Sequence, residues 1–385
     1  MSFCRIPLLL LFVIPTAFAL QDCELNGEYV NPANGNMTAG KTGIMKCRAR
    51  DSRLLVREQE LRTGSFIGLV RHFNRDGKLE SEFRVNDKGN REGLAREFFP
   101  DGRLAREASY RNGSIVGDSR SWHPNGNLKR TTAFSADGRE IAVAEFNDRG
   151  QLKELRCTDR PVLGKEVDDA SLCGHDARAP VVRELFSDKG VPRGRVVYLA
   201  GRLSLSESFW DNGKVQEQRE FGKDTSVDRR FSPEGVKLGE TRWIAVERGR
   251  TKELEQEFHA SGSLIRERRW QEGELAGEKN WYLNGQLKSD SRYTRRDGRA
   301  VCDLTDFHDT GKPSRHGSFL VNRGYLDHPI GKVSNFDGDG RLRQEREHDA
   351  NGRLTREREF DEAGKLLRDD AVFEDGSRKA YATQR

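Results

Sequence analysis

The sequence predicts an all-β protein, an elongated sheet or solenoid of repeated antiparallel β-hairpins with disulfide-tied insertions. Three observations predict this fold class. The 385-residue chain is 34% hydrophobic and 34% charged, which is too polar for the deep core of a compact domain of this length. Its 39 glycines suit a chain with many turns. Aromatic residues return at a fixed spacing, and no long stretch shows the periodicity of a helix.

Residues 1–19 have the pattern of a secretory signal peptide. Arg5 supplies a positive charge, an apolar run follows, and Ala17-Phe18-Ala19 is a small-x-small cleavage motif. The run of about 13 apolar residues is shorter than the roughly 20 that a membrane-spanning helix needs. We therefore expect a cleaved signal and a periplasmic or secreted protein, not an uncleaved anchor. Acylation of Cys23 is disfavoured because Gln21-Asp22 precedes it.

Export implies an oxidising compartment in which cysteines pair. Short loops make Cys23–Cys47 and Cys157–Cys173 the expected disulfides. Cys302 is then left over, either as a buried thiol or as a site of intermolecular pairing. A metal site formed by Cys157, Cys173 and His175 is the alternative, but the four-ligand spacing of zinc sites is absent.

The most informative pattern is an aromatic residue followed four positions later by glycine and often, two positions further, by leucine. Phe98–Leu104 and Trp281–Leu287 are examples. The glycines that fit are Gly77, Gly102, Gly126, Gly138, Gly150, Gly190, Gly213, Gly235, Gly262, Gly285, Gly311, Gly340, Gly352 and Gly364, with His348 in the aromatic position before Gly352. Another aromatic often follows eight residues after the glycine, which gives a period of 12 residues.

Twelve residues suit one strand and one tight turn. The glycines supply the positive φ that hairpin turns require, and a preceding Asn or Asp tolerates it better than most residues. Because leucine and the next aromatic are separated by an even number of residues, we expect them on one sheet face. From Leu264 to Trp270 this face would also carry Arg266 and Arg268, whose stems would cover the aromatic rings.

The run REGLAREFFPDGRLAREASYRNGSIVG, which ends at Gly117, and residues 253–277 resemble the MORN-variant repeat, the unit of YwqK-type antitoxin-like proteins. Residues 336–376 resemble the tyrosine–aspartate repeat of Rhs-like surface proteins, with Phe and His in place of Tyr. The resemblance implies a hairpin-repeat scaffold. Its family label further implies an immunity or antitoxin-like protein that captures a toxin.

The chain divides accordingly into segments. Residues 20–62 form an N-terminal cap, 63–156 a first repeat block, 157–182 a disulfide-tied insertion, 183–300 a second repeat block, 301–335 an irregular segment and 336–385 the C-terminal 12-residue repeats. A cap protects an open sheet edge from pairing with other chains. Residues 48–130 hold 18 basic and 12 acidic residues, whereas 336–370 hold 8 and 11, so the first region suits an anionic partner.

No catalytic motif is apparent, and nucleophile elbows, phosphate loops and Cys-x-x-Cys pairs are absent. Side chains of the types that bind metals or transfer protons do occur in the irregular segment, without metal-site spacing: Asp306, His308, Asp309, His316 and His328. Asp337–Gly340 matches only half of a calcium loop. We expect no catalytic, cofactor-binding or metal-ligating residues and no cofactor.

The sequence thus predicts an exported, non-enzymatic repeat scaffold that binds another macromolecule. A protein partner, such as a toxin, is the first expectation. A structural envelope protein that binds lipid or polysaccharide is the alternative, and an enzyme site within 301–335 is the third hypothesis. The net charge of +5 comes from intermixed signs, which argues against nucleic acid as the partner.

Overall fold

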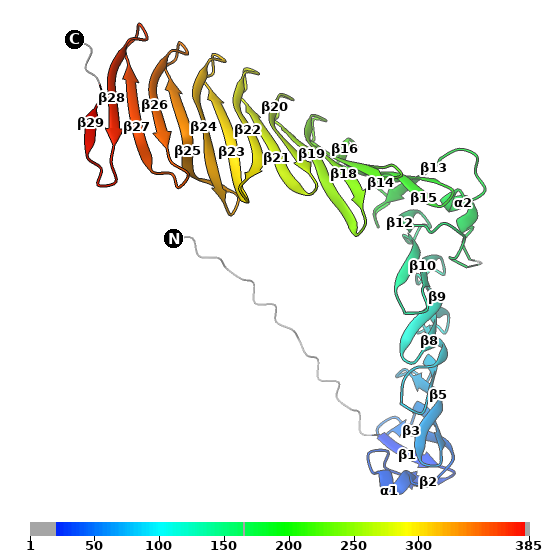
Figure 1. The fold of residues 1–385 in the computed structure, drawn as a ribbon. Coiled ribbons are helices and arrows are strands. Elements are labelled where there is room, and N and C mark those ends of the chain that lie inside the picture. Colours follow the sequence, from blue (N-terminus) through cyan, green and yellow to red (C-terminus); the bar gives the residue numbers. More distant parts are fainter. Residues whose placement is uncertain (1–20, 165, 382–385) are drawn as a thin grey trace. The chain divides into compact units, whose positions relative to one another are not determined.

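The computed structural model describes residues 21–164 and 166–381, so the expected signal peptide lies outside the described residues. The described chain is built almost entirely from antiparallel strands (Figure 1). It forms two compact units, and the boundary between them passes through the strands that lie between Val181 and Phe209. Of the described residues, unit 1 holds 21–164, 166–181, Leu185–Val191 and Leu199–Arg202, and unit 2 holds Val182–Glu184, Pro192–Tyr198 and 203–381.

The first sheet has 12 strands in the order β12-β11-β10-β9-β8-β7-β6-β5-β4-β3-β1-β2. Its strands are β1 (Gln21–Leu25), β2 (Glu28–Val30), β3 (Gly43–Ala49), β4 (Leu55–Arg62), β5 (Ser65–Phe73), β6 (Leu79–Val85), β7 (Gly93–Phe98), β8 (Leu104–Arg111), β9 (Ser114–Trp122), β10 (Leu128–Phe134), β11 (Glu140–Phe146) and β12 (Leu152–Arg156). From β3 to β12 each strand pairs with its neighbour in sequence, as the hairpin prediction requires.

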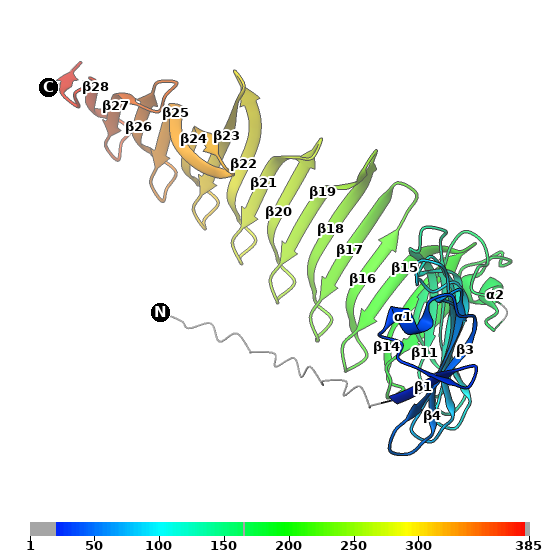
Figure 2. The ribbon, with the colours of Figure 1, turned by 90° about the horizontal axis from the view of Figure 1, so that it is seen from below.

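The second sheet has 17 strands in sequence order from β13 to β29. They are β13 (Val181–Phe186), β14 (Pro192–Leu199), β15 (Arg202–Phe209), β16 (Val215–Phe221), β17 (Thr225–Phe231), β18 (Lys237–Val246), β19 (Gly249–Phe258), β20 (Leu264–Gln271), β21 (Glu274–Trp281), β22 (Leu287–Arg296), β23 (Arg299–Phe307), β24 (Pro313–Asn322), β25 (Tyr325–Phe336), β26 (Leu342–His348), β27 (Leu354–Phe360), β28 (Leu366–Val372) and β29 (Arg378–Ala380). Figure 2 shows β15–β22 side by side in one layer. The predicted fold class is confirmed, and neither sheet closes on itself.

Each aromatic–glycine repeat forms a five-residue turn. After Phe98, for example, the N–H of Phe99 donates to the carbonyl of Arg103 and the N–H of Gly102 donates to the carbonyl of Phe99, both at 2.8 Å. The eleven glycines Gly77, Gly102, Gly126, Gly138, Gly150, Gly213, Gly262, Gly285, Gly340, Gly352 and Gly364 have φ between +73° and +93°. Two-residue turns such as Asn112-Gly113, with φ of +51° and +85°, connect other strands.

Asparagine before glycine has a different role in the five-residue turns from the one expected. Asn125, Asn212 and Asn284 do not adopt positive φ. Their side-chain amides instead donate to a backbone carbonyl of the next turn along the same edge, at 2.6–2.8 Å: Asn125 to Asp148, Asn212 to Pro233 and Asn284 to Asp309. These bonds connect successive turns along one edge of each sheet.

A register shift beside the turns corrects the prediction that leucine shares a face with the next aromatic and with the arginines between them. Leu264 lies opposite Phe258, whereas Arg266 lies opposite Glu257. One extra residue on β20 therefore turns Leu264 to the face opposite Arg266, because side chains alternate along a strand. We call the face of the second sheet that carries Arg266, Arg268 and Trp270 face A, and the other face B.

Two small cores stabilise the first sheet. At one end, Cys23 lies directly opposite Cys47 in the β1–β3 pair, and their disulfide packs with buried Leu25, Met45 and Leu61. This end also holds the short helix α1 (Gly35–Thr38). The predicted cap is thus an extension of the sheet itself.

At the other end, the segment after β12 covers one face of the sheet. The Thr131 hydroxyl donates to the carbonyl of fully buried Leu163 at 2.9 Å, and Arg120 pairs with Glu166 at 3.3 Å. The Cys157–Cys173 disulfide ties the segment to the helix α2 (Asp169–Cys173). Thr131, Ala144 and Leu155 lie in one cross-strand row and are buried.

Residues 301–335, expected to be irregular, lie in regular strands of the second sheet. β23, β24 and most of β25 cross this segment, and Leu304, Phe319 and Val333 form a buried cluster with Cys302. Burial raises the pKa of the Cys302 thiol. Burial, together with Cys302, also raises the pKa of neighbouring Tyr293 to about 12. Cys302 is therefore a buried free thiol, one of the two alternatives left open by the sequence.

Candidate binding surfaces on the second sheet

The predicted metal-binding or acid–base residues do not converge. The Asp306 carboxylate pairs with Arg315 on face A at 2.7 Å, whereas His316 on face B bonds the Thr305 hydroxyl at 2.9 Å. His308 and Asp309 belong to a turn at one edge, and exposed His328 lies beside Asp327. Within the described residues, no three His, Cys, Asp or Glu side chains gather where they could hold a metal ion.

The other two metal alternatives are explained by local structure. Both sulfur atoms of Cys157 and Cys173 are used in their disulfide, so the site with His175 is wrong. The Asp337 carboxylate accepts the N–H groups of Asp339 and Arg341 at 3.0 Å. The hydrogen bond from the backbone N–H of Arg341 lowers the pKa of Asp337, against an opposing effect of burial. The Asp-Gly-Asp-Gly sequence is therefore explained by the preference of aspartate and glycine for turns.

Alternating charges cross the middle of the first sheet. Six residues that lie directly opposite one another in consecutive strands are Glu58, Arg71, Glu82, Arg96, Glu107 and Arg120. Arg71 pairs with Glu58 at 3.4 Å and with Glu82 at 2.7 Å, and Arg96 pairs with Glu107 at 2.7 Å. Opposite charges facing each other across strands stabilise pairing and fix its register.

The second sheet holds buried carboxylates in similar rows. Glu240 is 6% exposed. Burial acts to raise its pKa, but hydrogen bonds from Lys237, Arg229 and Arg242 outweigh burial and lower the pKa below the ordinary value. The side chain therefore stays ionised near neutral pH. In a sheet of one layer, these charged rows hold the strands together, which is the role that an apolar core has in a compact domain.

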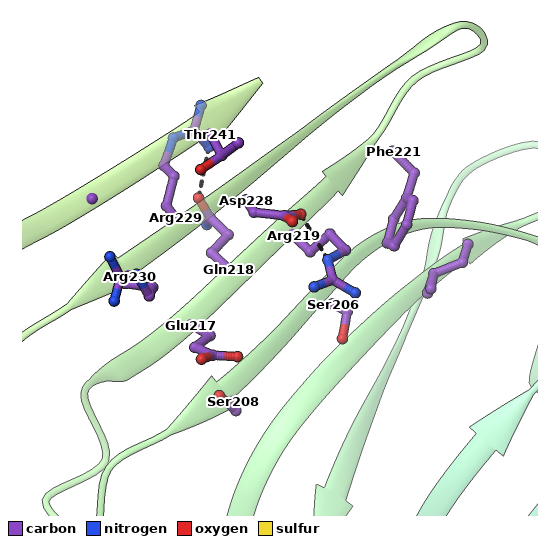
Figure 3. A pocket seen from close by; sticks show the side chains of 12 residues that line it. Ser206, Ser208, Glu217, Gln218, Arg219, Phe221, Asp228, Arg229, Arg230 and Thr241 are labelled. Atoms are coloured by element: carbon purple, nitrogen blue, oxygen red, sulfur yellow. Dashed lines mark hydrogen bonds and ion pairs between the residues drawn. The ribbon is translucent and has the colours of Figure 1, made fainter. Parts of the chain in front are cut away.

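A hollow of about 380 Å³, which we call hollow A, opens on face A over β15–β18 (Figure 3). Small residues on its two outer strands are part of its lining: Ser206 and Ser208 on β15, and Gly239 and Thr241 on β18. Arg219 and Asp228 form an ion pair at 2.7 Å beside it. Glu217 and Arg230 lie directly opposite each other and are exposed, yet neither has an ion-pair partner within 4.0 Å among the described residues.

Tryptophans and cations adjoin hollow A on the same face. The Trp243 indole N–H donates to Asp228 at 3.1 Å, and the Arg250 guanidinium lies 4.4 Å from the centre of the Trp243 ring. Lys252 lies between Trp243 and Trp270, at 5.8 Å and 5.1 Å from their ring centres. The chain's own cations thus cover these rings, but they are Arg250 and Lys252. Arg266 and Arg268, which were expected to do so, form ion pairs with Glu257 and Glu255.

Comparison with known proteins supports the repeat type. The family described as MORN repeat variant matches residues 91–112, which cover β7, the 99–103 turn and β8. This match supports a MORN-variant repeat at residues 91–112, within a chain of repeated antiparallel hairpins. Its closer likeness to YwqK-type and Rhs-like proteins stays a prediction. No curated protein matches the chain.

Several solved structures are similar in part. A crystal structure of TcdB2-TccC3-TEV is 10% identical, and the alignment covers 91% of this chain and 24% of that chain with a TM-score of 0.19. For the Photorhabdus luminescens Tc holotoxin pore the identity is 11%, the coverage 89% and 24%, and the TM-score 0.19. This chain thus spans about a quarter of the length of those chains. Similarity this low supports no inference about partners.

Proposed function

We propose that this chain is an exported, non-enzymatic scaffold that binds a protein partner on face A of its second sheet. The observation that carries the proposal is the pair of exposed, unpartnered charges, Glu217 and Arg230, beside hollow A. Neighbouring charges on this face, such as Arg219 and Asp228, are already paired. A partner with complementary charges gains most at positions where no internal pair must first be broken.

Export is the part of the proposal that the cysteines support. Two disulfides, Cys23–Cys47 and Cys157–Cys173, are of the kind that persists in an oxidising compartment. In the described part of the chain, no helix has the length and apolar character needed to cross a membrane. The finer proposal, an immunity-type protein that captures a toxin, is supported by the resemblance of the repeats to antitoxin-like proteins.

The envelope alternative has weaker support from face A. Binding of a sugar ring or an acyl chain would require accessible aromatic surface, as base stacking does in nucleic-acid binders. The rings of Trp243 and Trp270 are instead in contact with Arg250 and Lys252. Phe221 is the one aromatic residue in the lining of hollow A, and most of the other lining residues carry a charge of either sign or a hydroxyl group, which suits a protein surface of mixed charge.

Affinity capture with reversed charges tests the proposal. Immobilised wild-type protein, the variant Glu217→Arg/Arg230→Glu and the control Glu247→Arg/Arg248→Glu would be exposed to periplasmic extract of the native host. The control reverses two exposed charges in the β18–β19 turn and leaves net charge unchanged. We expect one protein to be retained by wild type and control, to be lost by the variant, and to bind again when purified.

Two outcomes would contradict the proposal. Equal retention by all three proteins would place binding elsewhere on the chain. Binding of wild type to anionic vesicles or lipopolysaccharide, lost in the variant and screened by salt, would support the envelope alternative.

A further inference from the structure

A second hollow lies on face B of the second sheet, and it depends on one glycine within a strand. Four such glycines differ in what fills the space above them. The Glu60 carboxylate fills it at Gly68, Val333 fills it at Gly317, and the Arg230 guanidinium approaches it at Gly239. At Gly277 the nearest atom to an added Cβ would be the backbone oxygen of Ser291, at 3.4 Å. The space above Gly277 is therefore open.

We call this space, of about 310 Å³, hollow B. Two ion pairs form its walls: Arg269 with Glu267 at 2.8 Å, and Lys279 with Asp290 at 3.3 Å. The strand register explains why they surround the glycine. Glu267, Lys279 and Asp290 lie in one cross-strand row, and Arg269, Gly277 and Arg292 lie in the next. Because Gly277 has no side chain, the space between the side chains of Arg269 and Arg292 is open.

Arg292 is the one cation in this lining without a carboxylate partner. Asp303, directly opposite it, is engaged by Arg296 at 2.5 Å and by the Ser318 hydroxyl at 2.6 Å. Among the described residues no carboxylate lies within 4.0 Å of Arg292, which is exposed. Its planar guanidinium, with five N–H donors, is therefore available to a ligand.

We propose that hollow B binds one acidic side chain of a protein partner. Its carboxylate would accept two parallel hydrogen bonds from Arg292, and its methylene stem would lie over Gly277. The two wall pairs are neutral in sum, so Arg292 leaves one positive charge, which matches a singly charged carboxylate. A phosphate group carries more negative charge and would be repelled by Glu267 and Asp290, whose carboxylates face the same space.

A protein fits this lining better than a polysaccharide does. No aromatic side chain lines hollow B, so a sugar ring would find no stacking surface. The volume suits a side chain, and the flanking pairs offer both signs of charge to the residues on either side of it. Hollow B is on the face opposite Arg230, so the proposal for hollow B can be confirmed or refuted independently of the function proposed for face A.

The test uses a hexaglutamate peptide and the full chain. Its affinity would be measured by calorimetry for wild type, Arg292→Gln, Gly277→Val and the control Arg248→Gln. The control removes an exposed arginine in the β18–β19 turn of the same sheet, which lines neither hollow A nor hollow B. Gly277 does not have positive φ, so valine is compatible with its backbone. Thermal melts and circular dichroism would establish that each variant folds.

We expect Arg292→Gln to weaken hexaglutamate binding by roughly tenfold to a hundredfold, the range for a charge-assisted hydrogen-bonded pair. Gly277→Val should weaken it similarly by filling the space, although it removes no charge. Arg248→Gln should bind like wild type.

Three results would overturn the proposal. Equal losses in Arg292→Gln and Arg248→Gln would mean diffuse attraction to a basic protein. If hexaglutamate does not bind to wild type at millimolar concentration, hollow B is not a binding site for an acidic side chain. Tighter binding of trigalacturonate than of hexaglutamate, with the same dependence on Arg292, would assign the carboxylate to a carbohydrate.

Discussion

Strands β10–β12 and β26–β28 have the same hairpin geometry but stabilise it in opposite ways. In β10–β12 the middle row is Thr131, Ala144 and Leu155, and the disulfide-tied segment covers it. In β26–β28 the corresponding row is Glu345, Arg358 and Asp369, joined by ion pairs. The repeat thus determines the backbone, and the middle row determines whether a covering segment is needed.

The largest effect should come from removing the cover of β10–β12. Cys157→Ser/Cys173→Ser opens a loop with a sequence separation of 16, which should cost about 3 kcal/mol of unfolding free energy. Hydrogen exchange should increase in β10–β12 and stay unchanged in β26–β28. Increased exchange in both regions would show that their stabilities are coupled.

The next effect concerns the charged row. Arg358→Met removes the bridge between Glu345 and Asp369, whose side chains are 11% and 9% exposed. Because two nearly buried carboxylates each lose a partner, we expect a loss of about 2 kcal/mol in urea unfolding. Arg353→Met is the matched control, since its partners Glu374 and Asp349 are 86% and 31% exposed and such pairs contribute roughly 0–1 kcal/mol. Equal losses would mean that the buried row has no special role.

The turns should not distinguish the two regions. Gly138→Val, in the β10–β11 turn, and Gly364→Val, in the β27–β28 turn, replace glycines with φ of +80° and +81°. Each should cost about 1–2 kcal/mol, because a β-branched residue is strained there. Melting temperatures would measure both, with Leu104→Val as a mild comparison. A clear difference between the two glycine variants would show that the covering segment, and not the turn alone, sets the cost.

The smallest effect is a pH dependence confined to the charged row. A hydrogen bond from Arg356 lowers the pKa of Asp369 below 3.8, against a smaller effect of burial. A lowered folded-state pKa contributes stability that is complete above the unfolded value and is lost as pH falls through the folded value. Exchange in β26–β28 should therefore increase below about pH 4 more than exchange in β10–β12. Asp369→Asn should reduce that difference; an unchanged difference would assign it to other carboxylates.

Much of the fold could be predicted from the sequence because its determinants are local. Turn glycines, strand lengths and both disulfide pairs depend on short-range spacing. The faces could not be predicted, since one extra residue beside a turn, as between Leu264 and Arg266, reverses the alternation. Two adjacent apolar residues, Leu264 and Ile265, are the sequence signal that could have indicated the bulge.

The candidate sites were harder to predict for a related reason. Hollow B exists because Arg269, Gly277 and Arg292 lie opposite one another on three strands. That relation depends on the register of two hairpins, and no short motif encodes it. Residues 301–335 were expected to be irregular because the repeat spacing weakens there, yet Leu304, Phe319 and Val333 are placed to form a buried cluster.

The amide bonds between successive turns have a mechanical consequence. Asn212 and Asn284 connect neighbouring turns on one edge of the second sheet, and these crosslinks resist the fanning of hairpins at that margin. The opposite margin has links of its own, because Arg295 pairs with Glu274 at 2.7 Å and Arg299 donates to the carbonyl of Ala350 at 2.8 Å. A ribbon tied along both margins resists flexure toward either side, so strain from a pulling load would be shared across its width.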